Sequence, residues 1–169
     1  LSYPVHFHGI DPEPHALVYE NKHLTVHSLP LRHSVPASGF LFREKDRPRG
    51  MRGEQIEKYD IPYKSIPAIK AGQDFVSAEY GTIANELLTV PPPRSRSFAF
   101  CSDTASQESL LDHIYGVDLL YHEATFLEKH KEQALETGHS TVKEAARIAA
   151  EGNVRTLVLG HYSTRYPLL

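Results

Sequence analysis

Alternation of apolar and polar residues in the first third of the chain predicts β-structure. Residues 15–28 contain two short alternating stretches, one on each side of the Glu20-Asn21-Lys22 segment, and this pattern predicts a hairpin. Residues 37–43 are mostly apolar and predict a further strand. We therefore expect the chain to begin with paired strands.

The middle of the chain has a weaker pattern. Residues 43–52 are rich in basic side chains and contain two chain breakers, Pro48 and Gly50, so they predict a solvated loop. Residues 54–93 mix short apolar runs and prolines with one possible helical turn, and they allow no clearer assignment.

The last part of the chain alternates between strands and helices. Strands are predicted at 97–102, 117–121 and 155–159, and helices at 107–115, 126–136 and 141–151. In the last of these helices, Thr141 and Glu144 have the spacing of a capping box, and Gly152 provides a stop signal. Strands that alternate with helices indicate right-handed crossovers and a largely parallel sheet.

Polar residues gather where these strands end. Asp103 follows the first strand, His122 and Glu123 follow the second, and His161 follows the third. Ligands bind at the carboxyl edge of open α/β sheets, so an Asp, a Glu and two His at that edge could bind a divalent metal and move protons. Taken singly, each could instead be a turn former or a surface residue. The same holds for His33 and His139, which lie in predicted loops.

Composition narrows the class of protein. The chain has 169 residues and a net charge of −3, so no global basic field indicates a nucleic-acid partner. Its single cysteine, Cys101, fits a reducing, cytoplasmic compartment, and no apolar run reaches the ~20 residues that cross a bilayer. We expect no membrane association. Eleven histidines are a reason to search for a site.

Read in order, the polar motifs resemble those of ribonuclease Z, the tRNA 3′-processing endonuclease family of the metallo-β-lactamase fold. The motifs are SDT (102–104), HEATF (122–126), GHST (138–141) and LGHYSTRY (159–166), and the stretch LRHSVPASGFLFREKDRPRG (31–50) is similar to the family's sequence around a metal-binding histidine. The resemblance implies an α/β fold, part of an αββα sandwich of mixed sheets flanked by helices. It leads us to expect residues 1–169 to form a single, incomplete domain of that type.

The resemblance also implies roles for individual residues. His33 is similar to a ligand of one zinc ion, Asp103 to the carboxylate that bridges two zinc ions, and His161 to a ligand of the second. Glu123 and His139 resemble the catalytic pair that assists proton transfer to the leaving 3′ oxygen. The expected cofactor is Zn²⁺, two per complete site. Candidate contacts to substrate phosphates are Arg43, Lys45, Arg47, Arg49 and Arg165, although solvated surface positions are an equally good interpretation.

This sequence departs from the family in two places. The family signature His-x-His-x-Asp-His is absent, and the nearest string, HFHGID (6–11), has its Asp one residue too late and is better interpreted as an ordinary strand. Residues 46–72 resemble only a shortened, proline-containing version of the family's basic substrate arm. We therefore expect the isolated chain to be inactive, because zinc sites are normally four-coordinate and too few ligands are present.

Three functions remain open at this point. The first is a zinc-dependent endoribonuclease that removes the 3′ trailer of precursor tRNA, as a homodimer. The second is a lactamase-fold phosphodiesterase for small esters. The third is a non-catalytic half that binds tRNA or mediates dimerisation, which would purify without tightly held zinc.

Overall fold

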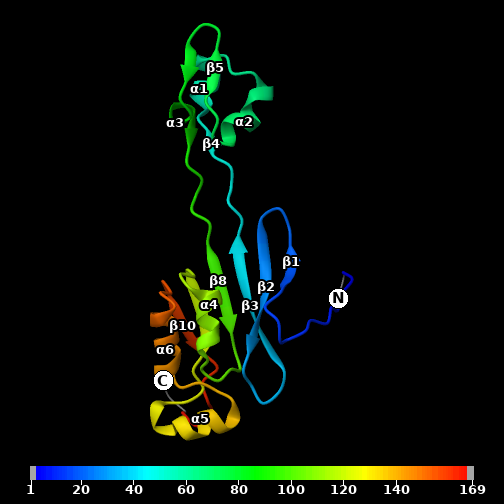
Figure 1. Cartoon of the computed structure of the whole chain (residues 1–169), viewed down its shortest axis with the longest axis vertical. Coiled ribbons are helices and arrows are strands. Elements are labelled where there is room, and N and C mark those ends of the chain that lie inside the picture. Colours follow the sequence, from blue (N-terminus) through cyan, green and yellow to red (C-terminus); the bar gives the residue numbers. More distant parts are fainter. Residues whose placement is uncertain (1–2, 167–169) are drawn as a thin grey trace. The chain divides into compact units, whose positions relative to one another are not determined.

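The computed structural model describes residues 3–166, and the chain divides into two compact units (Figure 1). The first unit comprises the residues up to Glu44 together with those from Arg96 onward. The second unit is Lys45–Ser95. Each unit has a hydrophobic core of its own.

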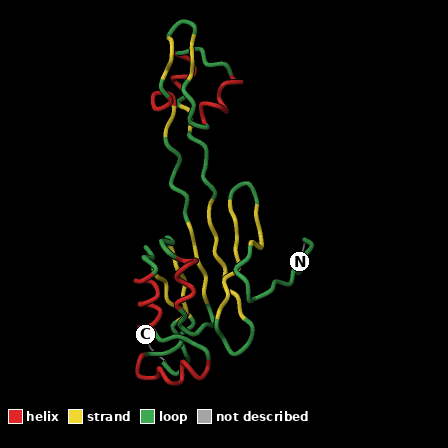
Figure 2. The backbone as a smooth tube through the Cα atoms, in the orientation of Figure 1, coloured by secondary structure: helices red, strands yellow, loops and turns green. Residues whose placement is uncertain are grey.

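A mixed six-stranded sheet forms the first unit, in the order β1-β2-β3-β8-β9-β10. The strands are β1 (Leu17–Glu20), β2 (Leu24–Leu31), β3 (Ala37–Glu44), β8 (Ser97–Cys101), β9 (Leu119–Glu123) and β10 (Leu157–Gly160). Neighbours from β1 to β8 are antiparallel, whereas β8, β9 and β10 run parallel. The predicted hairpin is confirmed, and Figure 2 shows it as two neighbouring strands joined by a short loop. The predicted parallel pairing of the last three strands is also confirmed.

The helical segments η2 (Glu108–Leu110), α4 (Leu111–Ile114) and α6 (Val142–Glu151) pack against the sheet through a shared core. The unit also contains η3 (Glu128–His130) and α5 (Lys131–Thr137). Ala99, Cys101 and Leu120 point from the strands into a buried cluster with Ile114 and Ile148. Because side chains alternate across a strand, the neighbouring Phe98, Phe100 and Tyr121 lie on the opposite face and are only half-buried.

The predicted ends of α6 are confirmed. The Thr141 hydroxyl accepts a hydrogen bond from the backbone N–H of Glu144 and the Glu144 carboxylate accepts one from the backbone of Thr141, which is the capping box that the spacing predicts. Gly152 occupies the C-terminal cap. Together these fix the helix that lies alongside β9 and β10 (Figure 1).

Several predicted elements differ in extent, and two of these differences lie next to the candidate site residues. The strand expected at 117–121 begins later and continues through His122 and Glu123. The helix expected from Phe126 begins only at the 3-10 turn of η3, because the backbone of Phe126 is paired with Thr141 and its carbonyl accepts the Val142 N–H.

Two expectations about the loops also change. The strand expected in 6–11 is wrong: the described residues before β1 contain no strand, and Phe7 is 93% exposed there. Residues 46–72, expected as a loop, contain β4 (Gly50–Met51), α1 (Gly53–Lys58), η1 (Tyr63–Ser65) and α2 (Ile66–Lys70). The remaining elements of this unit are β5 (Phe75–Ser77), β6 (Gly81–Ile83), α3 (Asn85–Leu88) and β7 (Thr89–Val90).

The second unit is held together by Ile61, Ile69, Ile83 and Leu88. Buried Asn85 adds a polar centre, since its side-chain amide donates to two backbone carbonyls at 2.7 Å each. The apolar residues of this unit are too irregularly spaced to show a helical or strand period. For that reason the sequence pattern predicted a loop at residues 43–52 and gave no clear assignment for residues 54–93.

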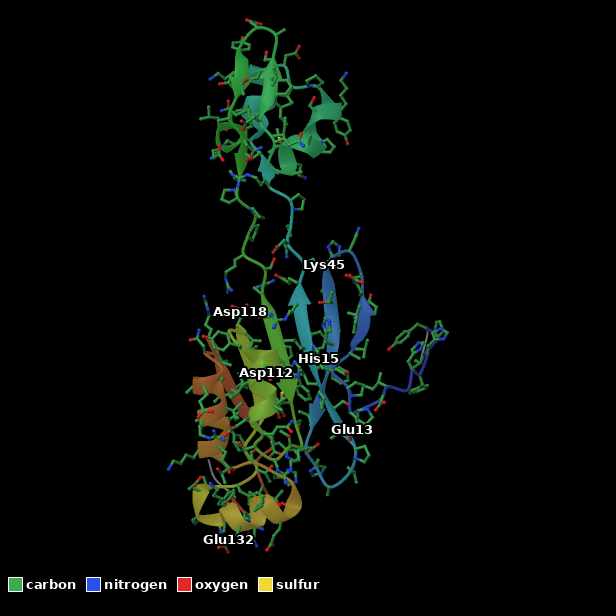
Figure 3. All side chains as sticks on the ribbon, in the orientation of Figure 1. Glu13, His15, Lys45, Asp112, Asp118 and Glu132 are labelled. Carbon is green, nitrogen blue, oxygen red and sulfur yellow. The ribbon has the colours of Figure 1, made fainter. Side chains whose placement is uncertain are left out.

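A stack of three histidines lies in the first unit. The ring of His15, labelled in Figure 3, stacks on His113 with 4.1 Å between centroids and on His27 with 5.1 Å. The rings are nearly parallel, at 16° and 12°. Because ring nitrogens bind metals in the plane of the ring, parallel stacked rings do not present their nitrogens to one ion.

Candidate metal and catalytic site

The carboxyl ends of the three parallel strands bring the predicted residues together. Asp103 lies two residues beyond β8, Glu123 is the last residue of β9, and His161 directly follows β10. The Nε2 atom of His161 lies 3.0 Å from Oδ1 of Asp103. Residues 58 positions apart in the sequence therefore meet at one edge of the sheet, as the strand pattern predicted.

His122 is not part of this group. It is fully buried, and its Nδ1 donates to the backbone carbonyl of Glu123 at 2.8 Å. Adjacent strand residues point to opposite faces, so only one of His122 and Glu123 can face the site. The expectation that both would contribute is wrong.

The backbone at this edge is strained. Asp103 and His161 both have left-handed φ angles, 56° and 57°. For residues with a Cβ this conformation costs on the order of 1–3 kcal/mol and is found mainly where function requires it. The two residues whose side chains face each other are thus both held in an unfavourable conformation.

Glu123 is the most heavily hydrogen-bonded side chain of the site. It is fully buried and accepts from the Thr104 N–H at 2.7 Å, the Thr125 hydroxyl at 2.6 Å, the Ser140 N–H at 3.1 Å and His139 Nδ1 at 2.7 Å. Burial alone would raise the pKa of the carboxyl group. The hydrogen bonds outweigh burial, and the net pKa of Glu123 is lowered. The side chain is therefore a buried carboxylate.

The histidines of the site share a pattern of hydrogen bonds. His139 uses Nδ1 to donate to Glu123, and His33 uses Nδ1 to donate to the carbonyl of Gly138 at 3.0 Å. The rings of His33 and His139 lie 4.8 Å apart between centroids. Gly138 permits this approach because its φ is +74°, and an added Cβ would lie 3.1 Å from the His33 ring nitrogen. In both histidines the Nδ1 proton is thus held by an acceptor within the protein.

The residues fit a divalent metal ion. One ligand atom from each of Asp103, Glu123, His139 and His161 lies within 4.8 Å of the others, and His33 is outside that group. Imidazole and carboxylate donors are the ligands that zinc accepts besides thiolate. Because the oxygens of Glu123 are already occupied by hydrogen bonds, Asp103 and the imidazole Nε2 atoms are better placed to hold the ion than Glu123.

The basic residues predicted to bind substrate lie outside this group and have partners within the protein. Arg43 donates to the carbonyl of His113 at 3.0 Å, Arg165 lies over the Phe126 ring at 5.0 Å, and Arg49 donates to the Thr89 hydroxyl at 2.6 Å. Lys45 and Arg47 also make interactions. Lys45, Arg47 and Arg49 belong to the second unit, and Arg43 and Arg165 to the first. Their substrate role stays a prediction.

Three site residues were not singled out from the sequence: Thr104, Thr125 and Ser140. All are buried, and all donate to Glu123. Each lies inside a motif that the sequence analysis quoted. Their position beside a predicted site residue was the signal that could have identified them.

The fold and site define an α/β protein with a candidate metal centre at the carboxyl edge of a mixed sheet. The family model described as "Beta-lactamase superfamily domain" matches residues 65–162, and the chain belongs to this superfamily. The predicted fold class is thereby confirmed.

Similar proteins narrow the comparison from the superfamily to one of its families. The chain is 45% identical to a ribonuclease Z of Bacteroides fragilis and 46% identical to one of Porphyromonas gingivalis, in each case over 98% of this chain and 55% of the relative. The chain therefore spans about half the length of the curated relatives it matches. The solved structure of human tRNase Z, short form, has a TM-score of 0.52 at 23% identity, covering 89% of this chain and 41% of that chain. The resemblance to ribonuclease Z is confirmed.

Among the described residues, no helix is long and apolar enough to span a membrane.

Proposed function

We propose that this chain carries part of the active site of a zinc-dependent endoribonuclease that removes the 3′ trailer from precursor tRNA by phosphodiester hydrolysis. The observation that carries the proposal is the group Asp103, Glu123, His139 and His161 at one sheet edge. Each of these residues stands in a motif that resembles ribonuclease Z. Similarity to relatives of that name over nearly the whole chain supports the same substrate class.

In this proposal zinc would be held by His33, Asp103 and His161. The bound metal supplies an activated water and stabilises charge on the phosphate. In its doubly protonated form, His139 would donate the Nε2 proton to the leaving 3′ oxygen, while Glu123 holds the Nδ1 proton. Glu123 touches no substrate and acts by orienting His139.

The basic residues Arg43, Lys45, Arg47, Arg49 and Arg165 are proposed to contact tRNA phosphates. Such contacts make affinity depend on salt concentration. Reversal of two of these charges is expected to weaken tRNA binding and to flatten its salt dependence. We further propose that the protein is cytoplasmic, supported by a single, buried and free cysteine. The homodimer rests on the family resemblance alone.

Cleavage of a precursor tRNA with a 3′ trailer by the natural full-length protein tests this proposal. A His139→Asn variant is expected to lose ~10²–10⁴-fold in rate, as for removal of a general acid. His23→Asn, at an exposed position, serves as the matched control and is expected to retain activity. Equal rates for wild type and His139→Asn would refute the assigned role.

Metal content separates the alternatives. Asp103→Asn is expected to reduce bound zinc per chain, whereas Asp112→Asn, at an exposed position on α4, is expected to leave it unchanged. Tight tRNA binding without cleavage or zinc would favour a non-catalytic binding module. Hydrolysis of a small chromogenic phosphodiester, without cleavage of precursor tRNA, would favour the small-ester enzyme.

A further inference from the structure

The side chain of Thr125 lies between Glu123 and His161 and is within hydrogen-bonding distance of both. Thr125 is only 7% exposed and lies two residues beyond Glu123. Its Oγ1 is 2.6 Å from Oε2 of Glu123 and 2.9 Å from Nδ1 of His161. One hydroxyl therefore stands between a buried carboxylate and an imidazole.

The direction of these two hydrogen bonds follows from counting protons. A hydroxyl has one proton to donate. Both oxygens of Glu123 accept bonds from backbone N–H groups, at Thr104 on one side and Ser140 on the other, so this carboxylate offers no proton of its own. At 2.6 Å, the Thr125 hydroxyl must donate to Glu123, because two oxygens that both present lone pairs at that distance would repel each other.

With its proton committed to Glu123, Thr125 has only lone pairs to offer to His161. The contact at 2.9 Å is then a bond in which His161 Nδ1 donates. Nδ1 therefore carries a proton, and Nε2, which lies 3.0 Å from Asp103 Oδ1, is the ring nitrogen that faces the other candidate metal ligand.

We propose that Thr125 is a positioning residue that holds His161 in the tautomer with its proton on Nδ1, and so keeps Nε2 available as a metal ligand. Glu123 then sets the tautomers of two histidines with one carboxylate: His139 directly and His161 through the Thr125 hydroxyl. This inference concerns the same site as the proposed function and takes from it that the metal is zinc.

Removing the hydroxyl changes which tautomer is favoured. A Thr125→Val variant keeps the shape of the side chain but gives Nδ1 of His161 no acceptor. Among the described residues the remaining polar partner of the ring is then Asp103, which favours a proton on Nε2. That proton would have to be displaced before Nε2 could bind a metal ion. Thr125→Ser keeps the hydroxyl and is the matched control.

The test uses the natural full-length protein and Zn²⁺ alone as the probe, in competition with a chromophoric chelator. Loss of a partner that orients a metal-binding histidine typically costs 10–100-fold in metal affinity. We expect a loss of ~10–100-fold for Thr125→Val and near wild-type affinity for Thr125→Ser. Equal affinity of wild type and Thr125→Val, or an equal loss in both variants, would overturn the inference.

A second measurement does not depend on metal. In metal-free protein at a pH well above the ordinary pKa of histidine, the ¹⁵N shifts of the His161 ring report which nitrogen carries the proton. The fraction with the proton on Nδ1 is expected to fall in Thr125→Val and to be retained in Thr125→Ser. If wild type binds no zinc, the proposed function fails, and this tautomer measurement still decides the role of Thr125: an unchanged fraction in Thr125→Val refutes it.

Discussion

Replacement of Glu123 by glutamine tests how the site is held together. The change preserves size but turns one carboxylate oxygen into an NH₂ group, which donates hydrogen bonds. One oxygen of Glu123 accepts from Thr104 and His139, and the other from Thr125 and Ser140. Whichever way the amide turns, its NH₂ group meets at least one backbone N–H that cannot reorient.

The expected cost follows from these contacts. The less costly orientation of the amide points its NH₂ group toward the Thr104 N–H and His139. His139 can then accept a hydrogen bond at Nδ1 if its ring proton moves to Nε2, whereas the Thr104 N–H loses its acceptor. One buried backbone hydrogen bond is then lost, at ~1–3 kcal/mol, and the other bonds lose their charged acceptor. We expect Glu123→Gln to lower the free energy of unfolding by about 3 kcal/mol.

Urea unfolding of wild type and variant measures this difference. Glu132→Gln, at the exposed position labelled in Figure 3, is the matched control and is expected to change stability by less than ~0.5 kcal/mol. A change below ~1 kcal/mol for Glu123→Gln would refute the view that Glu123 is an ionised hydrogen-bonding centre.

The pH dependence gives an independent check of the same residue. Because the folded-state pKa of Glu123 is lowered, its contribution is fully present above the unfolded pKa, about 4.5, and is lost as the pH falls through the lower folded value. In that acidic range the stability of Glu123→Gln is expected to fall less steeply than that of wild type. Parallel curves would contradict the direction of the pKa shift.

Three further predictions concern other parts of the chain. Gly160→Ala is expected to cost ~1–3 kcal/mol in thermal unfolding, because an added Cβ would lie within 2.6 Å of the Tyr121 ring; an unchanged melting temperature would contradict this. Asn85→Ala is expected to destabilise the second unit by ~1–3 kcal/mol, seen as faster amide exchange within Lys45–Ser95, since the buried carbonyl of Ile69 and the partly buried carbonyl of Gln73 lose their donor; unchanged exchange would exclude that role. Burial is the main cause of the lowered pKa values of His27 and His113 in the folded protein. As the pH falls below about 6.5, these two residues take up protons more readily in the unfolded chain than in the folded protein, which favours unfolding. Denaturant midpoints of wild type should therefore decrease between pH 7 and 5, and replacement of both histidines by asparagine should reduce this decrease.

Local signals in the sequence determined several elements of the fold. The hairpin, the parallel strands and the cap of α6 at Thr141 depend on residues close together in the chain, so periodicity and capping patterns predict them. The strand ends also indicated that Asp103 and His161 would meet. The resemblance to family motifs then implied roles for His33, Glu123 and His139. The second unit was not predicted, because its apolar residues follow no regular period and pack only in three dimensions.

Only the tertiary structure decided how the site is arranged. Side chains alternate between the two faces of β9, so Glu123 faces the site and His122 is buried in the core. Which of the two faces the site depends on how the strand is placed in the sheet and not on residue type. The left-handed backbone at Asp103 and His161 is imposed by the surrounding fold, since this conformation is uncommon for residues other than glycine, although Asp and His adopt it more readily than most. The role of Thr125 rests on two distances between residues from separate parts of the chain. Sequence thus named the chemical groups of the site, whereas long-range contacts decided which atoms face one another and which nitrogens carry protons.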